Sequence, residues 1–119
     1  MEGMGTVTES SAAAVVGTAE PLPHPERDAI ELTAVLQALS DPMRLIVVVA
    51  LSTGEERTCK SIDLPVVKST CTHHFRVLRE AGVIRQRHEG TSRMNSLRRA
   101  DLEARFPGLL DAVLAASQD

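Results

Sequence analysis

The stretch KSTCTHHFRVLREAGVI, residues 68–84, constrains the fold more than any other part of the chain. Cys71, Phe75 and Leu78 recur at the i, i+4 and i+7 spacing that places side chains in one stripe along a helix. Gly82 follows at a position typical of a helix C-terminal cap. The stretch therefore predicts an amphipathic helix whose apolar stripe packs on a core, followed by an extended segment.

The other side of this predicted helix is polar and basic. Short polar side chains lie toward its start and cations along its length, as in a helix whose N-terminal end enters the major groove of duplex DNA. The residues predicted to contact DNA from this side are Lys68, Ser69, Thr70, Thr72, His73 and Arg76. A solvated surface helix has the same general pattern, so the prediction of DNA binding needs support from the rest of the chain.

The distribution of charge gives that support. The chain has a formal net charge of −3, but residues 68–99 hold eight Lys and Arg against two Glu, a local charge of +6. The remaining residues hold five basic and fourteen acidic side chains, a charge of −9. A basic patch on an acidic body can steer a protein onto phosphates in one orientation.

Length and composition exclude several classes of function. A chain of 119 residues is expected to form one domain, and its two aromatic residues, both Phe, are too few for the stacking platforms that bind single strands. Neither a membrane span nor a leader is recognisable, so a cytoplasmic protein is expected. The four histidines form no recognisable catalytic arrangement, and we predict no enzyme activity and no cofactor.

The order of the predicted elements divides the chain into a tail and a domain. Residues 1–26 are rich in small residues and end in PLPHPE, which predicts a disordered tail and a Pro-rich linker before a domain at 27–119. Amphipathic spacing predicts a first helix over 27–39. Ser40-Asp41-Pro42 is a helix start, so the following run of β-branched residues is predicted as a buried helix up to Gly54, with Arg44 reaching the surface.

The elements around the basic helix predict a winged helix-turn-helix. A short third helix over 58–63 and a turn at Pro65 precede the basic helix. Residues 83–88 and 93–97 are extended runs joined by a four-residue loop at 89–92, a hairpin whose cations Arg87 and Arg93 are placed to contact DNA. A final helix begins at Arg99 and is kinked at Pro107. The fold class predicted is mainly α, with about five helices and a two-stranded wing.

Two motifs in this order carry a family resemblance. Asp41-Pro42 with Arg44, and the pattern Thr72, His74, Phe75, Leu78, Ala81, Gly82 and Val83, resemble the ArsR/SmtB family of bacterial winged-helix repressors over residues 27–115. The resemblance implies a homodimer formed by the first and last helices, which binds an inverted-repeat DNA operator and blocks transcription until an inducer releases it. It also implies that His74 is packed or hydrogen-bonded inside the unit.

The metal sites familiar in that family are not recognisable in this sequence. Many relatives bind an inducer metal through a Cys-x-Cys pair before the turn or through Asp and His on the last helix. Here Cys59 stands alone before the turn, and the last helix has acidic residues but no His, so we predict no metal site. The inducer is left open.

The two cysteines suggest an alternative signal. Cys71 lies in the apolar stripe and is expected to be a small buried side chain. Cys59, beside Arg57 and Lys60 near a predicted helix start, is in surroundings that favour the thiolate. A redox switch through Cys59, or through a bridge between Cys59 and Cys71, is therefore one alternative.

A second alternative is a winged-helix module that binds protein partners rather than an operator.

Overall fold

The computed structural model describes residues 22–117 of the chain. The part of the predicted tail before residue 22 lies outside the described residues. The elements in chain order are η2 (Arg27–Ala29), α1 (Leu32–Ala38), α2 (Pro42–Leu51), β2 (Arg57–Thr58), η3 (Cys59–Ser61), α3 (Lys68–Ala81), β3 (Ile84–Glu89), β4 (Ser92–Leu97), α4 (Arg99–Arg105) and α5 (Leu109–Ser117). Five α-helices and a three-stranded antiparallel sheet within the described residues confirm the predicted mainly α winged helix-turn-helix.

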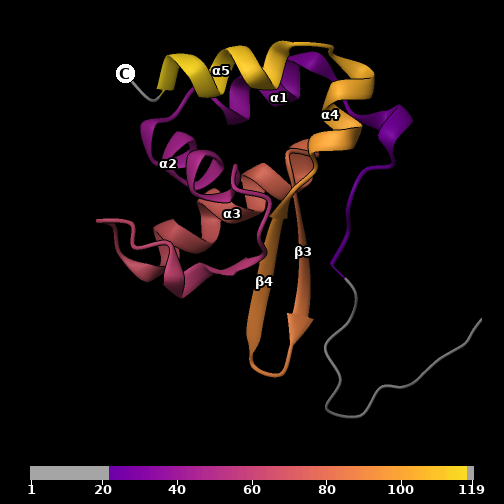
Figure 1. Cartoon of the computed structure of the whole chain (residues 1–119). Coiled ribbons are helices and arrows are strands. Elements are labelled where there is room, and N and C mark those ends of the chain that lie inside the picture. The colour runs from indigo at the N-terminus through magenta and orange to yellow at the C-terminus, as the bar shows by residue number, and fades with distance from the viewer. Residues whose placement is uncertain (1–21, 118–119) are drawn as a thin grey trace, which may run out of the picture.

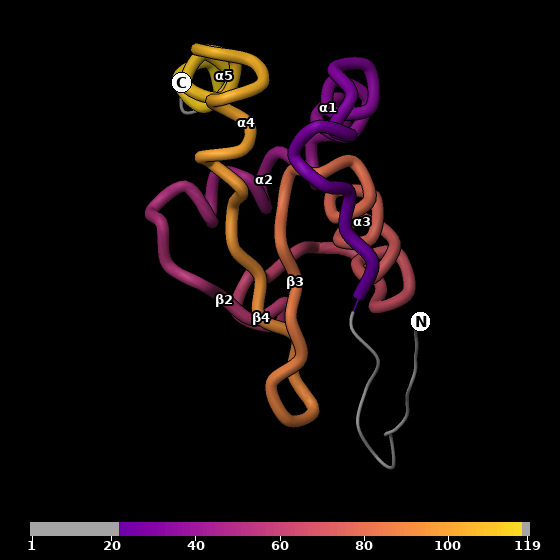
Figure 2. Tube along the Cα trace, turned by 90° about the vertical axis from the view of Figure 1, so that its right-hand side faces the viewer, coloured from indigo at the N-terminus to yellow at the C-terminus, as the bar shows by residue number. Residues whose placement is uncertain are grey.

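The helices and the hairpin lie at opposite ends of the molecule. Figure 1 shows α1, α4 and α5 at one end, α2 and α3 in the middle, and the β3–β4 hairpin projecting from the other end. In the view turned by 90°, α1 and α5 lie on opposite sides of that first end (Figure 2). The core between these elements consists of buried apolar side chains from every α-helix and from the start of β3.

The first predicted helix is shorter than its periodicity suggested. Residues 27–29 form a 3-10 turn, and α1 begins only at Leu32. The chain leaves the helical conformation at Ile30, whose side chain is only 1% exposed. Burial of Ile30 against Gly82 therefore interrupts a segment that its local pattern favours as one helix.

α2 forms as predicted, although its residues 46–49 are all β-branched. The Asp41 carboxylate accepts hydrogen bonds from the N–H groups of Met43 at 2.8 Å and Arg44 at 3.2 Å, and Pro42 is the first helical residue. Val47, Val48 and Leu51 are completely buried. These contacts outweigh the strand propensity of the run.

The α-helix predicted as the third helix, over 58–63, does not form. Its place is taken by the two-residue strand β2 and the single 3-10 turn η3. β2 pairs with β4, with Arg57 opposite Asn95. The two strands of the wing therefore belong to a three-stranded sheet with the order β2-β4-β3. Pairing with β4 provides backbone partners for Arg57 and Thr58, and the next three residues form the 3-10 turn.

The hairpin is tighter than predicted, and the last helix is fully broken. β3 and β4 pair from Ile84 opposite Leu97 to Glu89 opposite Ser92, so the turn has two residues rather than four. α4 and α5 are separated at residues 106–108, where Pro107 was expected to cause a kink.

Within residues 22–117 no single helix is long and apolar enough to cross a membrane; only α1 with α2, bent by 101°, meets that requirement as a pair.

Candidate nucleic-acid interface

The outward side of α3 gathers most of the residues predicted to contact DNA. Lys68, Ser69, Thr72, His73 and Arg76 are exposed and line one shallow depression of about 510 Å³. The sixth predicted residue of this helix, Thr70, is half-buried and lies outside this group. The depression combines hydroxyl, imidazole and cationic groups, which are the side-chain types that hydrogen-bond to phosphates and base edges.

The inward side of α3 packs as its stripe predicts. Phe75 and Leu78 are 1% and 0% exposed, and Cys71 is half-buried. His74 is also buried, with its Nδ1 at 3.1 Å from Nη1 of Arg44, which confirms that this histidine is packed inside the unit. The guanidinium of Arg44 folds back on α1 and donates to the Ala38 carbonyl at 2.6 Å, so the side chain is half-buried and reaches the surface only in part.

A second hollow lies between α3 and the wing. It has a volume of about 360 Å³ and is lined by Lys60 of η3, Lys68 and Thr72 of α3, and Arg93 of β4, among others. Three cations from three elements therefore face one groove. No local sequence pattern places Lys60 beside the wing, because that position depends on the pairing of β2 with β4.

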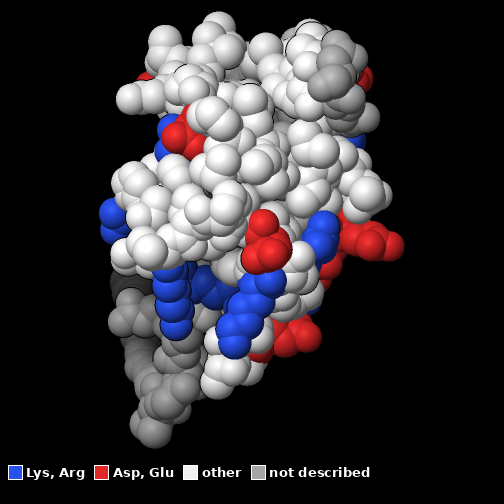
Figure 3. Space-filling view, turned by 90° about the vertical axis from the view of Figure 1, so that its left-hand side faces the viewer, with Lys and Arg blue, Asp and Glu red and all other residues white. Residues whose placement is uncertain are grey.

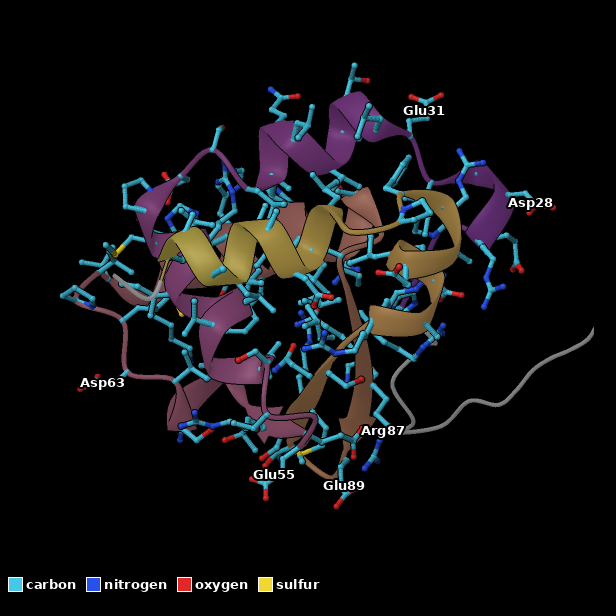
Figure 4. All side chains as sticks on the ribbon, turned by 45° about the horizontal axis from the view of Figure 1, so that its top comes forward. Asp28, Glu31, Glu55, Asp63, Arg87 and Glu89 are labelled. Carbon is cyan, nitrogen blue, oxygen red and sulfur yellow. The ribbon has the colours of Figure 1, made fainter. Side chains whose placement is uncertain are left out.

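The two predicted wing cations differ in their surroundings. Arg93 is half-buried and forms no ion pair within residues 22–117. Arg87 donates to the Glu56 carboxylate at 2.7 and 2.9 Å and also pairs with Glu89. These hydrogen bonds lower the pKa of Glu56 and raise that of Arg87. Figure 4 shows Arg87 and Glu89 together on the hairpin.

Burial and pairing reduce the basic patch that the sequence predicts. Arg79 and Arg98 are 5% and 6% exposed, and Arg85 and Arg99 pair with Asp101 and Asp111. Among the described residues, the cations of 68–99 that are accessible and without an ion pair are Lys68, Arg76 and Arg93. In Figure 3, most of the Lys and Arg on the face shown lie in its lower half, at the height of α3 and the wing, with Asp and Glu beside them, and the upper half is largely uncharged.

The cysteines lie beneath this surface. Cys59 belongs to a three-residue 3-10 turn rather than to the start of an α-helix, which corrects the expected setting of this thiol. Both cysteines are free and half-buried, and both line a pocket of about 370 Å³ between η3 and α3. Burial raises the pKa of the Cys71 thiol, and the nearby Cys59 raises it further. No cluster of three metal-ligating side chains occurs among the described residues.

The fold and this surface define a class of protein: a winged helix-turn-helix module with a polar, cationic recognition helix. No model of a protein family matches the chain. The uncharacterised HTH-type transcriptional regulator YceK of Bacillus subtilis is 33% identical over 82 residues, which are 66% of this chain and 82% of YceK.

Solved structures give the same class and a narrower family. A crystal structure of an ArsR family transcriptional regulator has a TM-score of 0.57 at 27% identity, over 73% of this chain and 91% of that one. The transcriptional repressor BigR of Xylella fastidiosa has a TM-score of 0.56 at 25% identity, over 71% and 84%. The chain belongs to the ArsR family of helix-turn-helix transcriptional regulators. The class is one of regulators rather than enzymes.

Proposed function

We propose that this regulator is a cytoplasmic homodimeric repressor that binds an inverted-repeat operator through α3 and the wing and is released by a signal. The single observation that carries operator binding is the exposed group of polar and cationic side chains on α3, Lys68, Ser69, Thr72, His73 and Arg76. Thr70, Arg87 and Arg93 complete the set of proposed contacts. Of these, Arg93 faces the groove and Arg87 is held by two glutamates.

The dimer is supported by apolar side chains that the single chain leaves exposed. Leu32 and Leu36 of α1 are each 45% exposed, and Ile46 of α2 is 42% exposed. α1 and α5 lie at the end of the molecule away from the hairpin (Figure 1), so a contact there leaves α3 free. Two recognition helices related by a dyad can enter successive major grooves about 34 Å apart, which gives the affinity that one short helix lacks.

The salt dependence of duplex binding tests this proposal. Lys68, Arg76 and Arg93 of both protomers make six phosphate contacts in the proposed complex, so the logarithm of affinity should fall with the logarithm of salt with a slope of about −5. Arg76→Ala and Arg93→Ala should each weaken binding to all sequences alike, and each should reduce the magnitude of that slope by about two per dimer. Fluorescence anisotropy with labelled duplexes measures both.

Selection of DNA from a random pool tests the specific part of the proposal. The purified protein should enrich a dyad-symmetric motif, and Thr72→Ala or His73→Ala should relax its sequence preference by about 1–3 kcal/mol per contacted base pair. A folded dimer that binds no duplex at low salt would instead be an interaction module for protein partners.

A further inference from the structure

The pocket between η3 and α3 brings the only two thiols of the chain to one place. Cys59 comes from η3 and Cys71 from the first residues of α3, and both line its wall. Cys59 also raises the pKa of the Cys71 thiol electrostatically, in accord with the place of both residues in the wall of this pocket. Neither cysteine is fully buried, so small solutes have access to the pocket.

The two sulfurs differ in ways that suit different chemical roles. The Asn95 side-chain amide donates a hydrogen bond to Sγ of Cys59 at 3.3 Å. Sγ of Cys71 lies in the apolar stripe of α3, where burial raises the pKa of its thiol. Since the thiolate is the nucleophilic form, burial disfavours Cys71 as the first nucleophile.

Asn95 belongs to a buried polar chain that ties η3 to the wing and to α3. Its Oδ1 accepts from Gln86 Nε2 at 2.7 Å, and Gln86 Oε1 accepts from Arg79 Nη1 at 2.7 Å. The exposed fractions of Arg79, Gln86 and Asn95 are 5%, 3% and 0%. Strand positions that face a core are ordinarily apolar, so the buried Gln86 and Asn95 depart from the usual pattern of such strands. Movement of Cys59 therefore disturbs Asn95, the residue through which this series of hydrogen bonds is joined to η3.

We propose that Cys59 and Cys71 form an intramolecular disulfide on exposure to a hydroperoxide, and that this bridge shifts the start of α3 and lowers affinity for duplex DNA. This inference rests on the proposed DNA-binding function and assigns a class of signal to it. Lys68 and Thr72 line the same pocket, so drawing its walls together displaces side chains at the proposed interface.

Formation of the disulfide requires only the two thiols and the hydroperoxide. The Cys59 thiolate attacks a peroxide oxygen, the O–O bond breaks, and protonation of the leaving oxygen gives water or an alcohol and a sulfenic acid on Cys59. The Cys71 sulfur then attacks the Cys59 sulfur, the S–O bond breaks, and the hydroxide leaves as water with the Cys71 proton. The two thiols lose two electrons, and the hydroperoxide gains them.

The test uses the reduced full-length protein and hydrogen peroxide. Peptide mapping by mass spectrometry without reductant should find the Cys59 peptide linked to the Cys71 peptide within one chain. Anisotropy with a duplex should show affinity reduced by about tenfold or more, which dithiothreitol restores. Cys59→Ser and Cys71→Val, the latter keeping an apolar side chain in the stripe, should bind like the reduced protein with and without peroxide.

Three results would overturn the inference. They are a bridge only between chains, an intrachain bridge with unchanged affinity, and an equal peroxide-induced loss of affinity in Cys71→Val. Failure of the reduced protein to bind any duplex is a different result, because it overturns the proposed function while the peptide map still reports on the bridge.

Discussion

At the residue scale, Gly82 shows how one position connects the recognition helix to the core. It ends α3 with φ of 89°, in the left-handed region, and a Cβ there would lie 2.7 Å from Cγ1 of Ile30. The side chain of Ile30 is almost fully buried, so it has little room to move away. Gly82 is therefore required both by the backbone and by the packing.

Gly82→Ala should lower the free energy of unfolding by about 2–5 kcal/mol, the sum of left-handed backbone strain and overpacking. Urea unfolding followed by circular dichroism measures it. Gly90→Ala is the matched control, because Gly90 has φ of 61° with nothing within 4 Å of an added Cβ, so only the strain applies. Equal losses in the two variants would contradict the role assigned to Ile30.

The pairing of Arg87 with Glu56 leads to a prediction about DNA affinity. Glu56→Gln removes one negative charge beside the wing and releases part of the Arg87 guanidinium. Affinity for duplexes of any sequence should rise, and the salt slope should steepen by about one per protomer. Asp28→Asn is the control, since Figure 4 places Asp28 far from Arg87. An equal gain in both variants would indicate only a change in net charge.

At the element scale, the segment before η2 is part of the packed unit. The backbone N–H of Gln86 donates to Nε2 of His24 at 2.9 Å, and Nδ1 of His24 lies 2.7 Å from the Leu22 carbonyl. The guanidinium of Arg98 donates to the Pro25 carbonyl at 2.8 Å. Residues of the predicted Pro-rich linker therefore contact β3, the outer strand of the wing, and the residue that precedes α4.

His24 makes this attachment dependent on pH. Burial lowers its pKa; the hydrogen bond to Leu22 opposes that shift, and nearby arginines, Arg85 first among them, add to it. Because the folded pKa lies below the ordinary 6.5, the stabilisation is present above pH 6.5 and is lost as the pH falls toward the folded value. His24→Gln keeps an acceptor that does not titrate. The unfolding free energy of the wild type minus that of the variant should fall below pH 6.5, and a constant difference would refute the prediction.

Element types followed from sequence where local and tertiary preferences agree. The N-cap of α2, the stripe of α3 and the glycine that ends α3 all act within one helix, so spacing identified them. The first and third predicted helices went wrong because Ile30 is required by the core and because β2 pairs with β4. Neither partner is near in sequence, and local periodicity contains no information about such contacts.

At the scale of the whole molecule, the exposed apolar side chains of α1 are expected to be covered by a second copy. Leu36→Glu should convert the proposed dimer into a monomer, since an unpaired carboxylate in an apolar interface costs about 3 kcal/mol or more, roughly a hundredfold in the dissociation constant. Size-exclusion chromatography with light scattering measures the mass. Val67→Glu, at a side chain 68% exposed beside α3, should leave the mass at that of two chains. A monomeric wild type would refute the dimer.

The sequence by itself determined the class of fold and the polar side of the recognition helix, because both depend on periodicity and on short-range capping. Only the tertiary structure decided which cations are available to DNA. Arg79 and Arg98 are buried, Arg87 is held by glutamates, and Lys60 joins the groove. Burial and ion pairing depend on residues distant in the chain, so a count of charges along the sequence overstates the basic surface.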